Sequence, residues 1–437
     1  LGLRLVGGLP VRRHATTILA ALGLLLGACD NSDPRPGNFG GDTTPVDGET
    51  DFFEKFEALI VTPDGTGITA AALEARAVRL IAEARGEIVA AFARLESTAI
   101  ADALVAAQGR GVTVYVAADT DARRDAGFAV LRDGGVQVVY GNGPIIWSPQ
   151  PGLNVQRLGS QNRMTHSMII ADGLRLVAAT GGFFDPEDED AVAQRWQVGF
   201  TAVGEIFVKD FRHTLKQLVA GTFATTLTLF GASTSADGNN RTIYPIEDGV
   251  VEAYYGPQEP LAKHIIDEIY RARSSVWIAS QTFANEALVD ALRYKARAGF
   301  EVRVVVPTSA RGEGYQFGDY TERVGLVADL EAALEADGVE GVIREKAAPM
   351  GTVVVLDAIR SPINNTKYAG QAMISTQPLA STIAFGPTEL RNETFPGRPS
   401  DVFTDGSMVV LRENNANPGT GDFPAAVAWF EALWEAE

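Results

Sequence analysis

Two parts of the chain carry the same order of apolar and polar positions. Residues 81–119 align with residues 269–307 at a constant offset of 188 and without a gap, and 11 of the 39 aligned positions are identical. The identities include a glycine that ends a helical pattern in each part, Gly111 or Gly299. Two alanine-rich helices would match in part by chance, but chance would not also align the glycine and the apolar run behind it. The chain therefore contains an internal repeat.

The periodicity within each copy predicts a helix, a strand, a second helix and a second strand. In the first copy we expect helices over residues 73–84 and 99–108 and strands over 88–92 and 112–116. The glycine after the second helix is typical of a helix C-terminus. Continuous apolar strands between helices favour an α/β fold with a parallel sheet covered on both faces. In the second copy the corresponding helices are 261–273 and 287–297, and the strands are 276–280 and 302–306.

Each copy continues with another strand and a closing amphipathic helix. The apolar runs 168–171 and 353–356 are closed by Asp172 and Asp357, now at an offset of 185. The last helix begins at Asp-Phe-Pro, residues 422–424, which is a good helix start. The apolar faces of the closing helices consist of Val203, Phe207, Phe211, Leu215 and Leu218 in the first copy and of Val427, Phe430 and Trp434 in the second.

The repeat predicts the organisation of the folded part, which at about 385 residues suits two domains of ordinary size. We expect two copies of one α/β unit, residues 52–230 and 247–437, related by an approximate twofold axis and facing each other across a cleft. Residues 231–246 begin with the small and polar run GASTSADGNN and are expected to form a linker.

The first 28 residues have the layout of a secretory signal. Arg4, Arg12 and Arg13 precede a short apolar stretch, and the stretch ends in Leu-Gly-Ala-Cys at Cys29. This tetrapeptide resembles the bacterial lipobox, which implies cleavage before Cys29 and a diacylglycerol thioether on its sulfur. Cys29 is the only cysteine, so it has no disulfide partner in the chain. A plain signal with a chance cysteine, or a buried apolar helix, is the alternative.

Composition supports an exported protein held by lipid. Residues 29–51 are rich in Asp, Gly, Pro and Thr, so we expect a flexible tether. The net charge is −18, and it becomes more negative when the three signal arginines are removed. An acidic surface argues against nucleic acid as a partner, because that needs clustered cations. The expected location is the bacterial cell envelope, and the sequence does not distinguish the inner from the outer membrane.

The second copy resembles the phospholipase D superfamily. The resemblance is carried by Tyr-Gly-Pro-Gln at 255–258 and by the helix and two strands within residues 265–304. It implies two α/β halves, each with a motif of His, any residue, Lys, four residues and Asp. In that family one His attacks phosphorus, the other protonates the leaving oxygen, and the two Lys hold the phosphate oxygens.

The motif residues themselves are replaced in both copies. Counting back from the two aspartates, the His positions hold Thr165 and Met350, and the Lys positions hold Ser167 and Thr352. His166 lies between two motif positions, so on a strand it should point to the opposite face. It is the only candidate catalytic residue, since the other histidines, His14, His213 and His264, fall in the signal and on helices.

Three further features of the sequence are candidate sites. The acidic run 185–190 lacks the ligand spacing of a calcium loop, so a solvated turn is favoured. In Gly-Glu-Gly at 312–314 the third glycine of a dinucleotide loop is misplaced and no helix start follows, so a plain connection is favoured. No cofactor or metal is expected. Basic residues near the motif positions either give the cleft a positive potential or serve solubility: Arg157, Arg163, Arg344, Lys346, Arg360 and Lys367.

These observations predict a membrane-anchored phospholipase D-like lipoprotein without catalysis, which binds a ligand or partner through the cleft between its halves. An anionic or phospholipid ligand fits that hypothesis. Two alternatives stay open. One is an active phospholipase D-type phosphodiesterase that acts on phospholipid and uses His166. The other is a scaffold lipoprotein of the cell envelope.

Overall fold

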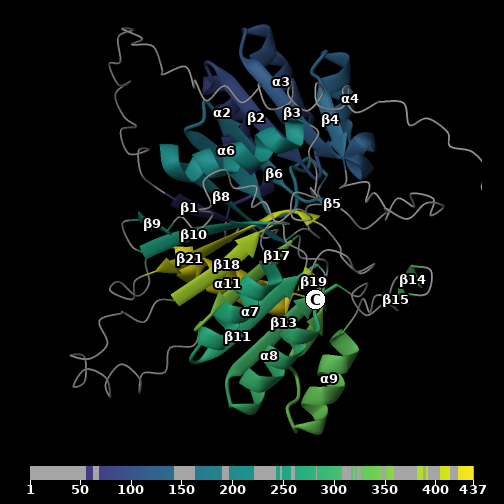
Figure 1. The fold of residues 1–437 in the computed structure, drawn as a ribbon, viewed down its shortest axis with the longest axis vertical. Helices are drawn as coiled ribbons and strands as arrows, with labels where there is room; N and C mark the ends of the chain where they lie inside the picture. Colours follow the sequence, from purple (N-terminus) through teal and green to yellow (C-terminus); the bar gives the residue numbers. More distant parts are fainter. Residues whose placement is uncertain are drawn as a thin grey trace, which may run out of the picture. The chain divides into compact units, whose positions relative to one another are not determined.

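The structure is a computed structural model, and both halves of the repeat lie in one compact unit, Asp51–Glu437 (Figure 1). The signal segment, Cys29, the tether and residues 231–242 of the expected linker lie outside the residues that it describes. The last four residues of the expected linker, 243–246, are wrong as linker because they form an edge strand, β9, of the second half. The described residues are 56–62, 68–141, 163–188, 196–220, 243–246, 249–256, 261–281, 283–307, 316–317, 320–321, 326–346, 351–358, 381–386, 390–391, 404–413 and 422–436.

The first half is a seven-stranded sheet with the strand order β1-β8-β7-β6-β2-β3-β4. β2, β3 and β4 are parallel, whereas β6, β7, β8 and β1 continue the sheet as antiparallel strands. The strands are β1 (Phe56–Val61), β2 (Glu87–Phe92), β3 (Thr113–Asp119), β4 (Val138–Gly141), β6 (Ser167–Ala171), β7 (Arg175–Ala179) and β8 (Gln197–Val203). The helices are α2 (Ala70–Glu83), α3 (Thr98–Gly109), α4 (Ala126–Asp133) and α6 (Glu205–Val219), with a 3₁₀ turn at Thr120–Arg124.

The second half repeats this order. Its sheet runs β16-β13-β11-β17-β18-β21-β10-β9, so each strand of the first sheet has a counterpart at the same place, and β9 is added at one edge. The strands are β9 (Ile243–Ile246), β10 (Gly249–Tyr255), β11 (Ser275–Ser280), β13 (Glu301–Val306), β16 (Ile343–Glu345), β17 (Thr352–Leu356), β18 (Ser381–Gly386) and β21 (Ser407–Glu413). The helices are α7 (Leu261–Arg271), α8 (Glu286–Arg297), α9 (Val327–Ala336) and α11 (Asp422–Glu435). The matching strand order confirms the repeat.

Short strands complete the description. β14 (Gln316–Phe317) pairs with β15 (Tyr320–Thr321), and β12 (Phe283–Ala284) pairs with β19 (Leu390–Arg391). β5 (Arg163–Met164) of the first half pairs in parallel with β20 (Thr404–Asp405) of the second. A backbone ladder therefore joins the two halves directly.

The same local signals begin and end the repeated helices. The Ser97 hydroxyl caps α3 by accepting from the Ile100 N–H at 3.1 Å, and the Asn285 side chain caps α8 by accepting from the Leu288 N–H at the same distance. Gly111 and Gly299 follow the two helices with φ of +91° and +81°. A residue with a Cβ is disfavoured in this left-handed region, which is why glycine ends both helices.

Two further sequence expectations differ from the structure. The sheets are mixed rather than purely parallel: β2 with β3 and β11 with β13 pair in parallel, whereas β7 and β18 pair antiparallel with β6 and β17. In the first half a tight turn at residues 172–174 joins β6 to β7. Tight turns can only produce antiparallel neighbours, whereas parallel pairing needs a crossover. Val203 belongs to the end of β8 and not to the closing helix, which begins at Glu205.

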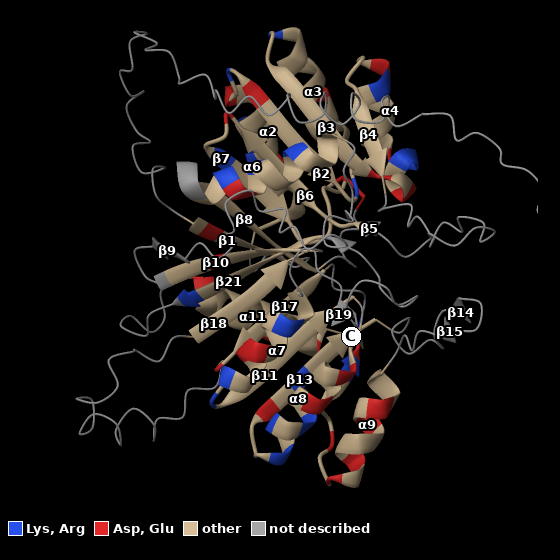
Figure 2. Ribbon diagram, in the orientation of Figure 1, with Lys and Arg blue, Asp and Glu red and all other residues tan. Residues whose placement is uncertain are grey.

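A single apolar cluster, here called the shared core, contains residues from both sheets and from α6 and α11. Contacts across the halves are reciprocal. Phe211 on α6 stacks edge-on against Tyr255 of β10 at 4.9 Å, and the Trp429 indole N–H on α11 donates to the Val61 carbonyl of β1 at 3.1 Å. The outer helices α2–α4 and α7–α9 cover separate cores, one in each half. The charged residues in Figure 2 are concentrated on helices and element ends. Among the described helices none has the length and apolarity to span a bilayer.

Candidate functional site at the motif strands

Asp172 and Asp357 occupy equivalent turns and have the same structural role. Each has a positive φ, 53° and 63°, directly after its strand. The Asp172 carboxylate accepts from the N–H groups of Gly86 at 2.7 Å and Glu87 at 3.1 Å. The Asp357 carboxylate accepts from the N–H groups of Arg273 at 2.7 Å and Ser274 at 2.8 Å. Both carboxylates thus tie the end of the preceding strand, β6 or β17 (the motif strands), to the end of the opening helix.

At the other end of these strands His166 and Gly351 are equivalent. The His166 carbonyl accepts from the Ala93 N–H at 2.6 Å, and the Gly351 carbonyl accepts from the Gln281 N–H at 3.0 Å. Gly351 has a φ of +75°, and a Cβ built there would lie 2.6 Å from the Gly386 carbonyl oxygen and 2.8 Å from that of Thr180 in the first half. The backbones of the two halves approach so closely here that only glycine fits.

His166 is fully buried and faces the second half. Its Nδ1 lies 3.4 Å from the Ser407 hydroxyl at the start of β21, and its Nε2 has no hydrogen-bond partner among the described residues. Burial without a neighbouring carboxylate lowers the pKa of His166 to about 3. The imidazole is therefore neutral at physiological pH.

The alternation of side chains along β6 explains this orientation. Met168 and Ile170 belong to the shared core, whereas Ile169 and Ala171 belong to the core of the first half. His166 is in phase with Met168, and Ser167 is in phase with Ile169. In the second half Val353 and Val355 face the shared core and Val354 faces its own. The face of the strand that carries His166 is therefore the face that meets the other half.

The two positions at which the resemblance implies lysine, Ser167 and Thr352, belong by the same alternation to the cores of their own halves. The Thr352 hydroxyl lies 2.9 Å from the Ser280 hydroxyl of the neighbouring strand, and Ser167 is opposite Phe92 at the equivalent place. Thr165 is partly buried, and Met350 lies outside the described residues. No lysine or arginine stands at a motif position of either half.

Little space remains between the halves at this point. Among the described residues a cavity of about 10 Å³ separates them, which is close to the minimum for one water molecule. Its lining comes from β6, β7 and β8 of the first half and from β18 and β21 of the second: Met168, Ala178, Ala179, Thr180, Val198, Phe200, Phe385, Gly386, Ser407 and Val409. The described residues that line this cavity therefore leave no room for a phosphodiester.

The other sequence candidates are spread over the surface. His213 on α6 is exposed and lies 3.0 Å from the Gln217 amide nitrogen, and His264 on α7 stacks on Tyr254 at 3.9 Å. Arg344 donates to the Trp434 carbonyl and stacks on the Trp434 ring at 4.3 Å, so it holds the end of α11. Asp185 accepts from the Glu187 N–H within its own turn. The described residues contain no cluster of ligands for a metal.

Arg157, Arg360, Lys367, residues 189–190 and residues 312–314 lie outside the described residues, as does the linker at 231–240. Arg163 begins β5, and Lys346 follows β16 and is partly buried.

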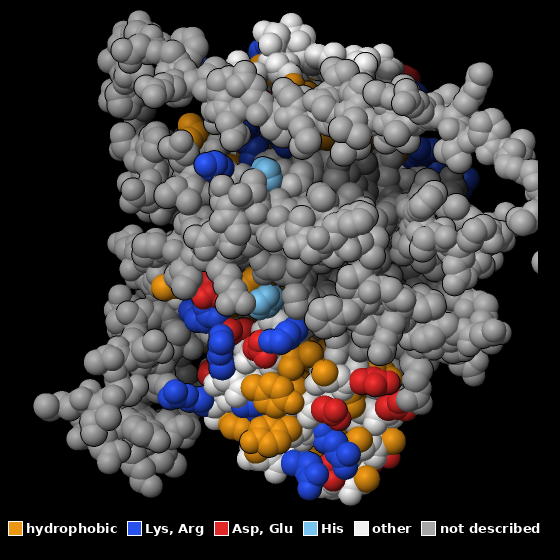
Figure 3. Space-filling model, viewed as in Figure 1, with side chains coloured by type: hydrophobic (Ala, Val, Ile, Leu, Met, Phe, Trp, Pro, Cys, Tyr) orange, Lys and Arg blue, Asp and Glu red, His pale blue; other side chains and the backbone are white. Residues whose placement is uncertain are grey.

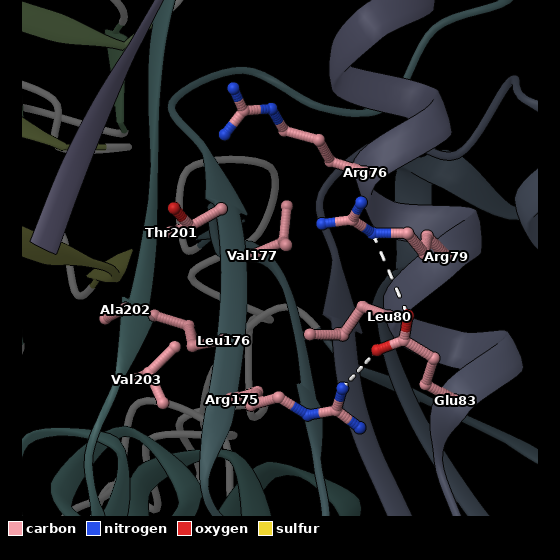
Figure 4. Close-up of a pocket in the computed structure, with 10 residues that line it drawn as sticks. All are labelled: Arg76, Arg79, Leu80, Glu83, Arg175, Leu176, Val177, Thr201, Ala202 and Val203. Atoms are coloured by element: carbon pink, nitrogen blue, oxygen red, sulfur yellow. Dashed lines mark hydrogen bonds and ion pairs between the residues drawn. The ribbon is translucent and has the colours of Figure 1, made fainter. Parts of the chain in front are cut away.

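A groove of about 40 Å³ lies between α2 and strands β7 and β8 of the first half (Figure 4). Arg76, Arg79 and Arg175 surround an apolar floor that includes Leu80 and Leu176. Each arginine has a carboxylate beside it: Arg76 pairs with Glu57 at 2.5 Å, Arg175 pairs with Glu83, and Arg79 lies 3.9 Å from Glu83. Glu83 serves two of the arginines, and the third carboxylate is Asp172, which lies 3.9 Å from Arg175. With Asp172 the three arginines have three carboxylates beside them, so the groove offers little net attraction for an anion.

The equivalent region of the second half is filled by a charged network. Arg412 of β21 pairs with Glu252 of β10 at 2.6 Å and with Glu268 of α7 at 2.7 Å, and Arg271 also pairs with Glu268. The two carboxylates raise the pKa of the Arg412 guanidinium despite its burial. Removal of one member would leave a poorly solvated charge, so this network is structural.

Comparison with solved structures identifies the fold. Phosphatidylserine synthase from Haemophilus influenzae superposes with a TM-score of 0.50 at 10% identity, covering 87% of each chain. Polyphosphate kinase from Porphyromonas gingivalis gives a TM-score of 0.41 at 14% identity and covers 84% of this chain but only 45% of its own length. The phospholipase D family member Nuc from Salmonella typhimurium gives 0.28 at 16% identity, covering 38% of this chain and 93% of its own.

The protein accordingly has a phospholipase D-like fold in two α/β halves, as the sequence resemblance implied. No model of a protein family matches the sequence, and no curated protein matches it significantly. At sequence identities of 10–16% the likeness to these structures concerns the fold alone.

Proposed function

We propose that this protein is a lipid-anchored, phospholipase D-like envelope protein that has lost phosphodiesterase chemistry and serves in binding. The ligand or partner would be recognised by the region between the halves. Because the cavity there is only about 10 Å³, the ligand or partner would contact the line where the halves meet at the surface rather than enter between the sheets.

The observation that carries the proposal is the state of His166. A covalent route needs a nucleophile that can reach phosphorus and an acid that can protonate the leaving oxygen. His166 has none of its surface exposed, and its counterpart is Gly351, which has no side chain at all. Cationic groups that would hold the phosphate oxygens are also absent from the motif positions. Loss of one oxyanion-type donor already costs about 100-fold in rate.

Hydrolysis of phosphatidylcholine and of bis-p-nitrophenyl phosphate by purified residues 51–437 tests the proposal. The expected result is no turnover above the buffer rate in the wild type or in His166→Ala. The matched control is His213→Ala, since His213 is an exposed histidine on α6. Turnover that disappears in His166→Ala and persists in His213→Ala would refute the loss of catalysis.

One observation favours the active enzyme as a second candidate. His166 is on the side of β6 that faces the second half, and a hydroxyl, that of Ser407, lies near its Nδ1. A neutral imidazole can act as a nucleophile once it is accessible. The same hydrolysis assay separates the two candidates.

The anchor is a proposal of its own and rests on the lipobox at Cys29. Cells that express the full chain and are fed radiolabelled palmitate should label the wild type, whereas Cys29→Ser should remain as unlabelled precursor. Equal labelling of the two chains would refute lipidation of Cys29. The protein would then be attached to the membrane in another way or not at all.

A further inference from the structure

Two exposed tyrosines lie side by side at the ends of α7 and α8 in the second half. Tyr270 is 48% exposed and Tyr294 is 60% exposed, and their ring centroids are 5.9 Å apart. Each is in the last turn of its helix. Figure 3 shows hydrophobic side chains gathered over α7 and α8, with basic side chains beside them.

The two chain segments that carry the tyrosines are basic, although neighbouring residues supply carboxylates to two of their arginines: Arg271 pairs with Glu268, and Arg297 lies 3.9 Å from Asp337. Residues 270–273 and 293–300 contain five Lys and Arg and no Asp or Glu, in a protein with a net charge of −18. Arg271, Arg273 and Arg297 are exposed, whereas Lys295 is buried and donates to the Tyr270 and Ala272 carbonyls. The tyrosines and the three exposed arginines are here called the tyrosine–arginine patch.

The repeat provides an internal control for this patch. At the offset of 188 the first half has Ala82 and Ala106 where the second has the two tyrosines, and both alanines are exposed at the ends of α2 and α3. Glu83 stands at the place of Arg271, and Gly109 stands at the place of Arg297. The same fold forms without the tyrosines, so folding does not require them.

Helix stability explains only part of the patch. Basic residues in a last turn interact favourably with the helix dipole, which accounts for Arg271 and Arg297. Exposed aromatic rings gain nothing from that effect and leave apolar surface in water. A surface that is aromatic, cationic and unnecessary for folding is suited to binding.

We propose that the tyrosine–arginine patch docks the body of the protein on an anionic lipid surface. Tyrosine rings are favoured at the level of lipid headgroups because one end is apolar and the other is polar. Arginines near the surface of an anionic membrane contribute about 1 kcal/mol each. The biological setting rests on the proposed anchor: the 26 residues between Cys29 and Phe56 would span roughly 25–30 Å as a flexible coil, which lets the body reach the bilayer.

Docking by this patch would also orient the site. β11 runs from Ser275, next to the patch, to Ser280, which pairs with Thr352 of the motif strand. The patch and the motif strand's start are therefore at opposite ends of β11. A body docked in this way would present the motif end of the second half away from the bilayer, where a ligand or partner from the aqueous phase can reach it.

Sedimentation with vesicles tests the proposal, and the protein used is residues 51–437, the compact unit that carries both halves. Vesicles of phosphatidylcholine with 30% phosphatidylglycerol should bind the wild type, and high salt should weaken binding. Tyr270→Ala/Tyr294→Ala, which installs the residues of the first half, should raise the lipid concentration for half binding at least about tenfold. Arg273→Gln/Arg297→Gln should raise it about 20- to 30-fold, from the loss of two surface arginines.

Two matched controls are in the first half. Tyr115→Ala removes another exposed tyrosine, and Arg85→Gln removes the repeat counterpart of Arg273. Both should bind like the wild type. A wild type that stays in the supernatant at millimolar anionic lipid would overturn the proposal and leave the patch for a protein partner. Patch variants that bind like the wild type would overturn it as well. Since this chain lacks Cys29 and the assay measures no hydrolysis, the result is independent of the anchor and of catalysis.

Discussion

Replacement of His166 by leucine should change the pH dependence of stability in a direction fixed by burial. In the unfolded chain the imidazole has a pKa near 6.5, and in the folded protein the pKa is about 3. Below pH 6.5 the unfolded state therefore binds a proton that the folded state excludes. The wild type loses stability as the pH falls from about 6.5 towards 3, and above 6.5 the histidine contributes no pH dependence.

The two pKa values set the magnitude. Linkage gives a loss of about 2 kcal/mol between pH 7 and pH 5, and about 4–5 kcal/mol by pH 3. Leucine has a similar volume and no proton, so His166→Leu should lose about 2 kcal/mol less than the wild type over the first interval. Other groups titrate equally in both proteins and cancel in the difference.

Urea unfolding of residues 51–437 at pH 7 and pH 5, followed by circular dichroism, measures this difference. Leucine also removes the contact with Ser407, so the absolute stabilities at pH 7 need not agree, and only the change with pH is decisive. The matched control is His213→Leu, because His213 is exposed on α6. If the free energy of unfolding of the wild type and of His166→Leu falls equally between pH 7 and pH 5, then His166 is solvated or paired. The description of His166 as a buried neutral imidazole would then be wrong.

Two further predictions concern the strand ends. Gly351→Ala should lower the free energy of unfolding, measured in urea, by at least about 3 kcal/mol, because the new Cβ would meet the Gly386 and Thr180 carbonyl oxygens. The control is Gly338→Ala: Gly338 has a φ of +74° but open space around it, so the loss should be only about 1 kcal/mol. Equal costs for the two glycines would contradict the close approach of the halves. Asp172→Ala and Asp357→Ala should each lower the free energy of unfolding by about 1–3 kcal/mol, because each leaves backbone N–H groups without an acceptor. The control is Asp133→Ala, which changes an exposed side chain and should lower it by less than about 0.5 kcal/mol. A loss of stability for only one of the two turn aspartates would show that the turns are not equivalent.

The structure adds two interactions that the sequence pattern did not reveal. Ser407 meets His166 from a strand 241 residues later in the chain, and the network of Arg412 with Glu252 and Glu268 joins β21, β10 and α7. Neither has a local signature. Arg412 and Glu268 are nearly buried charges, and only knowledge of burial distinguishes such residues from ordinary surface charges. The tyrosine–arginine patch was also not predicted, although comparison of the two repeat copies position by position would have shown it.

The sequence by itself determined the repeat, the order of the first two helices and strands in each copy, the strands that end at Asp172 and Asp357, and the closing helices. These features follow from short-range physics: side-chain period, helix caps at Ser97 and Asn285, and glycines at left-handed positions. It also showed that His166 and Ser167 point to opposite faces of β6, because a strand alternates strictly. Only the tertiary structure decided which of these faces meets the other half. Both faces of β6 are apolar because both are covered. Alternation therefore shows which residues share a face, but not which face meets the other half. That depends on how α6, α11 and the two sheets pack into one core.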